Sequence, residues 1–169
     1  MNENQLLHVL LTTTFAKSDL SRRLGIAREY VNQRFFTSGG KKDVKKFLAG
    51  GNLSVDDQRV LTEWGDDFLQ TFTKENASSL FDALDREVKN LPVINLYVPM
   101  ELGSQDVAKI GTWMRKNLDP SVLIELHRDS STFGGCALAW EGMYHDYSLH
   151  HTLRTKIDPI RKILSEYAK

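Results

Sequence analysis

The chain has 169 residues, enough for one or two small domains. Its 22 basic and 22 acidic residues balance, which disfavours a dedicated nucleic-acid binder because phosphate contacts usually need a basic excess. The single cysteine, Cys136, excludes an internal disulfide. No apolar run approaches the roughly 18 residues of a membrane span. The acidic, polar start lacks the basic residues of a secretory signal, so we expect a cytosolic chain.

The first 91 residues show helical periodicity. Gly25 is expected to divide the first helical stretch in two, and Ser38-Gly39-Gly40 to separate that stretch from the next. Ser54 is the predicted N-cap of the longest later helix. These features predict an all-helical bundle over residues 1–91. Apolar side chains recur at helical spacing in residues 4–36, 41–48, 54–72 and 76–91.

The character of the sequence changes at Pro92. β-Branched and aromatic residues between prolines predict a first strand, and Gly142 predicts a turn between two later extended segments. Pro159 is expected to kink or split the last helix. The fold class is therefore α+β, with the helical bundle followed by a small mixed domain over residues 92–169. Its expected order is strand (93–98), helix (104–118), strand (121–128), strand (135–140), a short extended piece (143–147) and helix (148–167).

One short motif near the C-terminus combines turn, glycine and capping signals. Asp129 is placed to close a turn with its side chain. The Gly134-Gly135 pair opens a strand, which indicates a positive φ or a close approach of another backbone. Asp146 or Ser148 is the predicted N-cap of the last helix. By themselves these residues indicate only a small α+β domain.

In its order and spacing this motif resembles the family of the bacterial ATP synthase delta subunit and the mitochondrial oligomycin-sensitivity-conferring protein. That family has an acidic residue, a glycine pair opening a strand, an Asp-x-Ser at the last helix and a later leucine. The strand before Pro99 and the helix after it also match, whereas Tyr147 stands where the family usually has glycine. The matching positions are Asp129, Gly134, Gly135, Asp146, Ser148 and Leu153.

The resemblance implies a non-catalytic stator subunit of a rotary F-type ATP synthase, without a cofactor. Residues 1–91 would bind the alpha subunits of the catalytic head, and residues 92–169 the C-terminal helices of the stalk's b subunits. Such a subunit lies peripherally on the cytoplasmic side of the bacterial cell membrane, without inserting into it and without binding nucleic acid. The last helix has more apolar positions than one buried face requires, which suits helix docking: Leu153, Ile157, Ile160, Ile163 and Leu164.

A DNA-binding regulator is the main alternative. Residues 18–36 have the pattern of a helix-turn-helix, in which Leu20 and Leu24 would pack and Gly25 would form the turn. The segment from Arg28 to Arg34 would then lie on the recognition helix. The pattern is short and degenerate, and the balanced charge counts against it.

A small enzyme is the third hypothesis. Cys136 lies in an apolar run, where a buried structural thiol is the simpler interpretation. His145, His150 and His151 lie near Asp146, but their spacing is unusual for zinc, and capping or solvated histidines are favoured. No phosphate-binding glycine loop and no Gly-x-Ser-x-Gly elbow is present.

Overall fold

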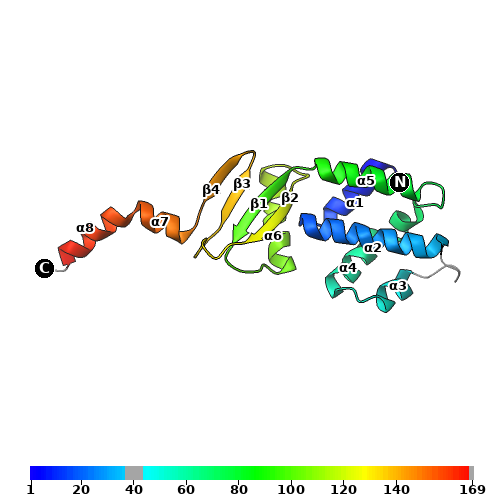
Figure 1. Cartoon of the computed structure of the whole chain (residues 1–169), viewed down its shortest axis with the longest axis horizontal. Helices are drawn as coiled ribbons and strands as arrows, with labels where there is room; N and C mark the ends of the chain where they lie inside the picture. Colours follow the sequence, from blue (N-terminus) through cyan, green and yellow to red (C-terminus); the bar gives the residue numbers. More distant parts are fainter. Residues whose placement is uncertain (37–43, 168–169) are drawn as a thin grey trace. The chain divides into compact units, whose positions relative to one another are not determined.

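The computed structural model describes residues 1–36 and 44–167. The Ser38-Gly39-Gly40 break and the first residues of the helix expected at 41–48 lie outside these ranges. The described chain forms two compact units (Figure 1). The first comprises residues 1–92 and 104–123, and the second comprises residues 93–103 and 124–169.

The first unit is entirely helical apart from its connections and the first residue of one strand. Helix α1 packs against α4 and α5, and α2 packs against α4 (Figure 1). The unit also includes α6, which follows the first strand in the chain. The bounds are α1 (Glu3–Thr13), α2 (Lys17–Phe36), α3 (Val44–Gly50), α4 (Val55–Gln70), α5 (Ala77–Asn90) and α6 (Ser104–Asn117).

Local capping signals decide where two of these helices begin. Asn2 accepts a hydrogen bond from the backbone of Gln5, and the Gln5 side chain accepts one from the backbone of Asn2, so α1 starts with a capping box. Ser54 accepts from the backbone N–H of Asp57 and caps α4, which confirms its predicted role. Gly65, with φ 77°, bends α4 within its length.

The expected division at Gly25 is wrong, because α2 is one helix of 20 residues. A glycine inside a helix costs only about 1 kcal/mol relative to alanine. Burial of Leu24, Ala27 and Val31 along the same helix offsets that cost. Ser18 and Asp19 lie in the first turn of α2.

A row of aromatic rings forms the centre of the helical unit. Trp64, Phe68 and Phe72 follow one another at four-residue steps, and their rings pack in sequence although Gly65 interrupts the helix after Trp64. Ring centroids of neighbours lie 4.8 and 5.5 Å apart, and Phe72 stacks on Phe81 of α5 at 4.3 Å. These contacts join α4 and the segment that follows it to α5.

Helix α6 packs against the connection between α1 and α2. A Cβ atom on Gly111 would lie 2.4 Å from the ring of Phe15, so only glycine allows this approach. The Arg115 guanidinium donates to the carbonyls of Leu11 and Thr14 and lies 4.4 Å from the Phe15 ring centroid. Burial lowers the pKa of Arg115 to about 10.

The second unit contains a sheet with strand order β2-β1-β3-β4. Strand β3 is antiparallel to both β1 and β4. The β1–β2 pair is parallel, because the N–H of Leu123 donates to Pro92 and, further along both strands, that of Asp129 donates to Val98. The strands are β1 (Val93–Val98), β2 (Leu123–Arg128), β3 (Ala137–Trp140) and β4 (Met143–Asp146).

Glu141 and Gly142 form a two-residue connection between β3 and β4. Both have positive φ, 49° and 77°, as the usual tight hairpin turn requires. Strand β1 alternates in burial, with Ile94, Leu96 and Val98 on its buried side.

The chain ends in two short helices, α7 (Leu149–Thr155) and α8 (Ile157–Tyr167). The break lies at Lys156, as the predicted effect of Pro159 requires. Proline has no N–H to donate to Thr155 four residues earlier, and its ring would clash with that carbonyl. Within α8, Pro159 falls in the first turn, where backbone N–H groups have no helical partner in any case.

The α+β fold class is confirmed, with helices first and a strand-rich region after them. The second strand begins at Leu123 and the third at Ala137, each two residues later than expected.

Candidate functional site

The structure brings five of the six motif positions together at the start of α7. The backbone N–H of Leu149 donates to the carbonyls of Phe133 and Gly134, both at 3.2 Å. The N–H of Tyr147 donates to Cys136 at 2.9 Å. The segment that leads into β3 and the segment that leaves β4 therefore lie backbone against backbone.

Both glycines are required by this approach. Gly134 has φ 70°, a conformation that side chains disfavour, and a Cβ there would lie 2.8 Å from the Cβ of Leu149. A Cβ on Gly135 would lie 2.4 Å from the carbonyl oxygen of Tyr147 and 3.0 Å from the Cα of Ser148. The interpretation of the glycine pair as a place of positive φ and close packing is confirmed.

Asp129 closes the turn before the glycine pair. Its carboxylate accepts a hydrogen bond of 2.8 Å from the backbone N–H of Ser131. Hydrogen bonds from Ser131 hold the pKa of Asp129 below its ordinary value. The hydroxyl of Thr132, which is 3% exposed, donates to the Asp129 carbonyl. The predicted turn role of Asp129 is confirmed.

Asp146 and Ser148 both form hydrogen bonds at the start of α7. Asp146 accepts from the backbone N–H of Ser148 at 2.8 Å, and hydrogen bonding from the side chain and backbone of Ser148 lowers the pKa of the Asp146 carboxyl. The Ser148 hydroxyl, 1% exposed, accepts from the N–H of His151 at 3.1 Å, so Ser148 is the N-cap. The side-chain hydrogen bonds of this cluster serve turns and a cap, and together they fix where α7 begins.

Leu153 lies apart from the cluster, on the exposed surface of α7. It belongs to a set of apolar side chains on α7 and α8 whose exposed fractions run from 41% to 86%. The part of α7 and α8 whose burial is described contains no buried residue. We name this set the C-terminal apolar face: Leu149, Leu153, Ile157, Ile163, Leu164 and Tyr167.

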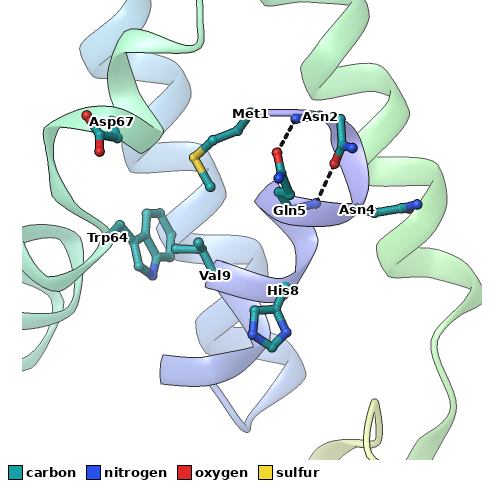
Figure 2. Close-up of a pocket in the computed structure, with 8 residues that line it drawn as sticks. All are labelled: Met1, Asn2, Asn4, Gln5, His8, Val9, Trp64 and Asp67. Atoms are coloured by element: carbon teal, nitrogen blue, oxygen red, sulfur yellow. Dashed lines mark hydrogen bonds between the residues drawn. The ribbon is translucent and has the colours of Figure 1, made fainter.

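A groove of about 610 Å³ lies in the helical unit between α1 and α4 (Figure 2). Met1, Val9 and Trp64 supply apolar surface, while His8 and Asp67 are among its polar residues. The indole N–H of Trp64 donates to Thr13 of α1 at 2.8 Å, which fixes the ring beside α1. We name this the α1–α4 groove. The complete lining is Met1, Asn2, Asn4, Gln5, His8, Val9, Trp64 and Asp67.

Sequence patterns predicted the helical bundle but did not identify these lining residues. The groove depends on how α1 packs against α4, and their residues are some 50 positions apart, as the 51-residue separation of Trp64 and Thr13 illustrates.

The helix-turn-helix hypothesis for residues 18–36 fails on geometry, because α2 has no turn at Gly25. Its basic side chains are also engaged within the protein. Arg22 and Arg23 form ion pairs with Asp57 at 2.9 Å, and Arg28 pairs with Asp85 at 2.8 Å. These contacts join α2 to α4 and α5 and leave less positive charge for phosphates.

The residues considered for catalysis or metal binding do not have the surroundings that these roles require. Burial raises the pKa of the Cys136 thiol, the direction opposite to that of an activated thiolate. Among the described residues, no group of three or more histidine, cysteine or acidic side chains is arranged to hold a metal ion. His151 instead lies with its Nδ1 3.9 Å from the Asp146 carboxylate.

No protein-family model matches the chain, and no curated protein matches it. Within the described ranges, every helix is too short or too polar to cross a bilayer.

Proposed function

We propose that the chain is a non-catalytic stator subunit of a rotary F-type ATP synthase, of the delta and oligomycin-sensitivity-conferring type. It would join the catalytic head to the peripheral stalk and resist rotor torque during proton-driven ATP synthesis. On this proposal it works at the cytoplasmic side of a bacterial cell membrane, held there by its partners.

The observation that carries the proposal is the cluster at the start of α7. These positions were selected by resemblance: Gly134 and Gly135 pack against residues 147–149, Ser148 donates to Asp146, and Asp129 closes the turn that leads to the glycine pair. Their side-chain hydrogen bonds are made with backbone N–H groups, which suits a structural joint better than a reaction centre. The C-terminal apolar face begins directly at this joint.

A second observation is consistent with an adaptor. The α1–α4 groove lies in one compact unit, and the C-terminal apolar face lies in the other. Grooves between helices commonly accept an amphipathic helix. On this proposal the groove takes an N-terminal segment of an alpha subunit, and the C-terminal face takes the stalk's b helices.

Head binding is tested with the full chain and a labelled peptide from the N-terminus of an alpha subunit. Val9→Arg places a charge in the α1–α4 groove and should weaken binding at least tenfold. Val55→Arg is the matched control, because Val55 is 85% exposed and lies outside the groove lining. Absence of peptide binding at physiological salt, or equal loss in both variants, contradicts this part of the proposal.

Stalk binding is tested by deleting residues 158–169. The described residues of this segment are exposed wherever burial is defined, so the truncated chain should fold. In one reconstitution it should still bind the head and lose the stalk. Full stalk binding by the truncated chain would place the stalk site elsewhere.

A further inference from the structure

The C-terminal apolar face lies on helices that are short for independent stability. Helix α7 has 7 residues and α8 has 11. Isolated helices shorter than about 12–15 residues are marginal in water, and most helical stability in proteins comes from packing of an apolar face. Leu153 and Leu164 are nevertheless 47% and 62% exposed. A packing partner would stabilise both helices.

The apolar positions have the spacing of a helix-packing seam. Leu149 and Leu153 are one turn apart on α7. On α8, Ile157 and Leu164 are seven positions apart and Tyr167 follows three later, the spacing with which one helix packs along another. The seam therefore suits a partner helix.

The charges beside this seam are positive. Arg161 comes four residues after Ile157 and three before Leu164, so it borders both on the helix surface. Lys156 comes three residues after Leu153. Lys156 and Arg161 form no ion pair with any other described residue.

The negative charges of α8 lie on a different stripe. Asp158, Lys162 and Glu166 follow one another at four-residue steps, which aligns them along one side of the helix. That side is turned away from Leu164 and Tyr167, because a helix advances by about 100° per residue, and within the face Glu166 borders only Ile163, three residues before it. The surface next to the apolar seam is therefore more basic than α8 as a whole.

We propose that the C-terminal apolar face binds an amphipathic helix with acidic residues beside its apolar seam. The inference rests on the proposed function in taking that partner to be the stalk, and it adds the partner's chemistry. A second copy of this chain is disfavoured, since two basic margins would meet in either orientation and like charges beside a seam oppose pairing.

The experiment uses the full chain and two synthetic helical peptides with the same leucine and isoleucine seam. One peptide has glutamate at the positions beside the seam, and the other has lysine there. The glutamate peptide should bind at least tenfold more tightly at low salt, and the ratio should fall as salt is raised. Hydrogen exchange within residues 149–167 should slow on binding.

A matched pair of variants locates the effect. Arg161→Glu and Lys162→Glu are adjacent and change the charge equally, but only Arg161 borders the seam. Arg161→Glu should abolish or reverse the preference for the glutamate peptide, while Lys162→Glu should retain most of it. Leu164→Asp should weaken both peptides. Peptide binding by each variant is measured after hydrogen exchange of the first unit has shown that the variant is folded.

The outcomes separate this inference from the proposed function. Equal binding of both peptides, equal effects of the two charge variants, or self-association at the seam would overturn the acidic-partner inference. If native stalk helices bind and Arg161→Glu has no effect, the inference fails and the stator function stands. If the folded chain binds neither peptide nor stalk, both fail.

Discussion

The Cα of Gly135 faces the carbonyl oxygen of Tyr147 so closely that a Cβ would lie 2.4 Å from that oxygen. Because the obstructing atom belongs to the backbone, it cannot rotate away as the end of a side chain could. The contact joins the approach to β3 with the start of α7.

Gly135→Ala should therefore destabilise the second unit by about 1–3 kcal/mol, the usual cost of forcing atoms into a packed site. Gly135→Val should cost more, because its side chain is larger. Hydrogen exchange should accelerate in residues 124–155 and remain unchanged in residues 1–36. Ser130→Ala, in the exposed part of the same loop, is the control and should be neutral. Wild-type exchange in Gly135→Val would show that the close approach is not needed.

Gly111 and Gly25 should respond to alanine in opposite directions. Gly111→Ala would bring a Cβ within 2.7 Å of the Cβ of Phe15 and should cost about 1–3 kcal/mol. No atom lies within 4 Å of a Cβ at Gly25, so Gly25→Ala should stabilise α2 by up to about 1 kcal/mol. Urea unfolding of both variants shows whether each substitution raises or lowers the free energy of unfolding. A stabilising Gly111→Ala would contradict the packing of α6 on Phe15.

The Asp57 ion pairs should make the helical unit sensitive to acid. Burial by itself raises the pKa of Asp57, but hydrogen bonds from Arg22, Arg23 and Ser54 outweigh it and hold the value at about 2. A carboxyl with a lowered native pKa contributes stability above its unfolded pKa, near 3.8, and loses it as the pH falls toward 2. The contribution is about 2 kcal/mol.

Asp57→Asn should remove this contribution and leave the buried Arg23 without one of its two carboxylate partners. We expect the free energy of unfolding at pH 7 to fall by about 3–5 kcal/mol. The difference in this free energy between the variant and the wild type should narrow as the pH falls from 4 to about 2. Urea unfolding at several pH values provides the measurement. Asp66→Asn, on an exposed side chain of the same helix, should change little. A pH-independent difference would argue against a lowered pKa for Asp57.

Arg115 should be essential for holding α6 against the end of α1. Arg115→Met keeps much of the side-chain volume but leaves the carbonyls of Leu11 and Thr14 without their donor. We expect a loss of about 1–3 kcal/mol, the usual cost of unsatisfied buried polar groups. Arg115→Lys should recover part of it, since an ammonium group supplies donors without the planar fork. The thermal unfolding temperature should be highest for the wild type, lower for Arg115→Lys and lowest for Arg115→Met.

The sequence by itself determined the features that depend on near neighbours. Ser54 and Ser148 cap helices because their hydroxyls accept from backbone N–H groups three positions away. Pro159 interrupts the last helix because it has no N–H for the carbonyl four residues earlier. The order of helices and strands, and hence the α+β class, follows from such local signals together with apolar periodicity.

Only the tertiary structure decided the features that join distant segments. The local sequence predicts a helix break at Gly25. The burial of apolar side chains along α2 outweighs the cost of one glycine, so the helix continues through it. The grouping of α6 with the helical unit depends on Phe15 and Arg115, 100 positions apart in the chain, and the α1–α4 groove depends on residues some 50 positions apart. Spacing along a sequence specifies which face of an element is apolar, but which surface covers that face depends on packing among all elements.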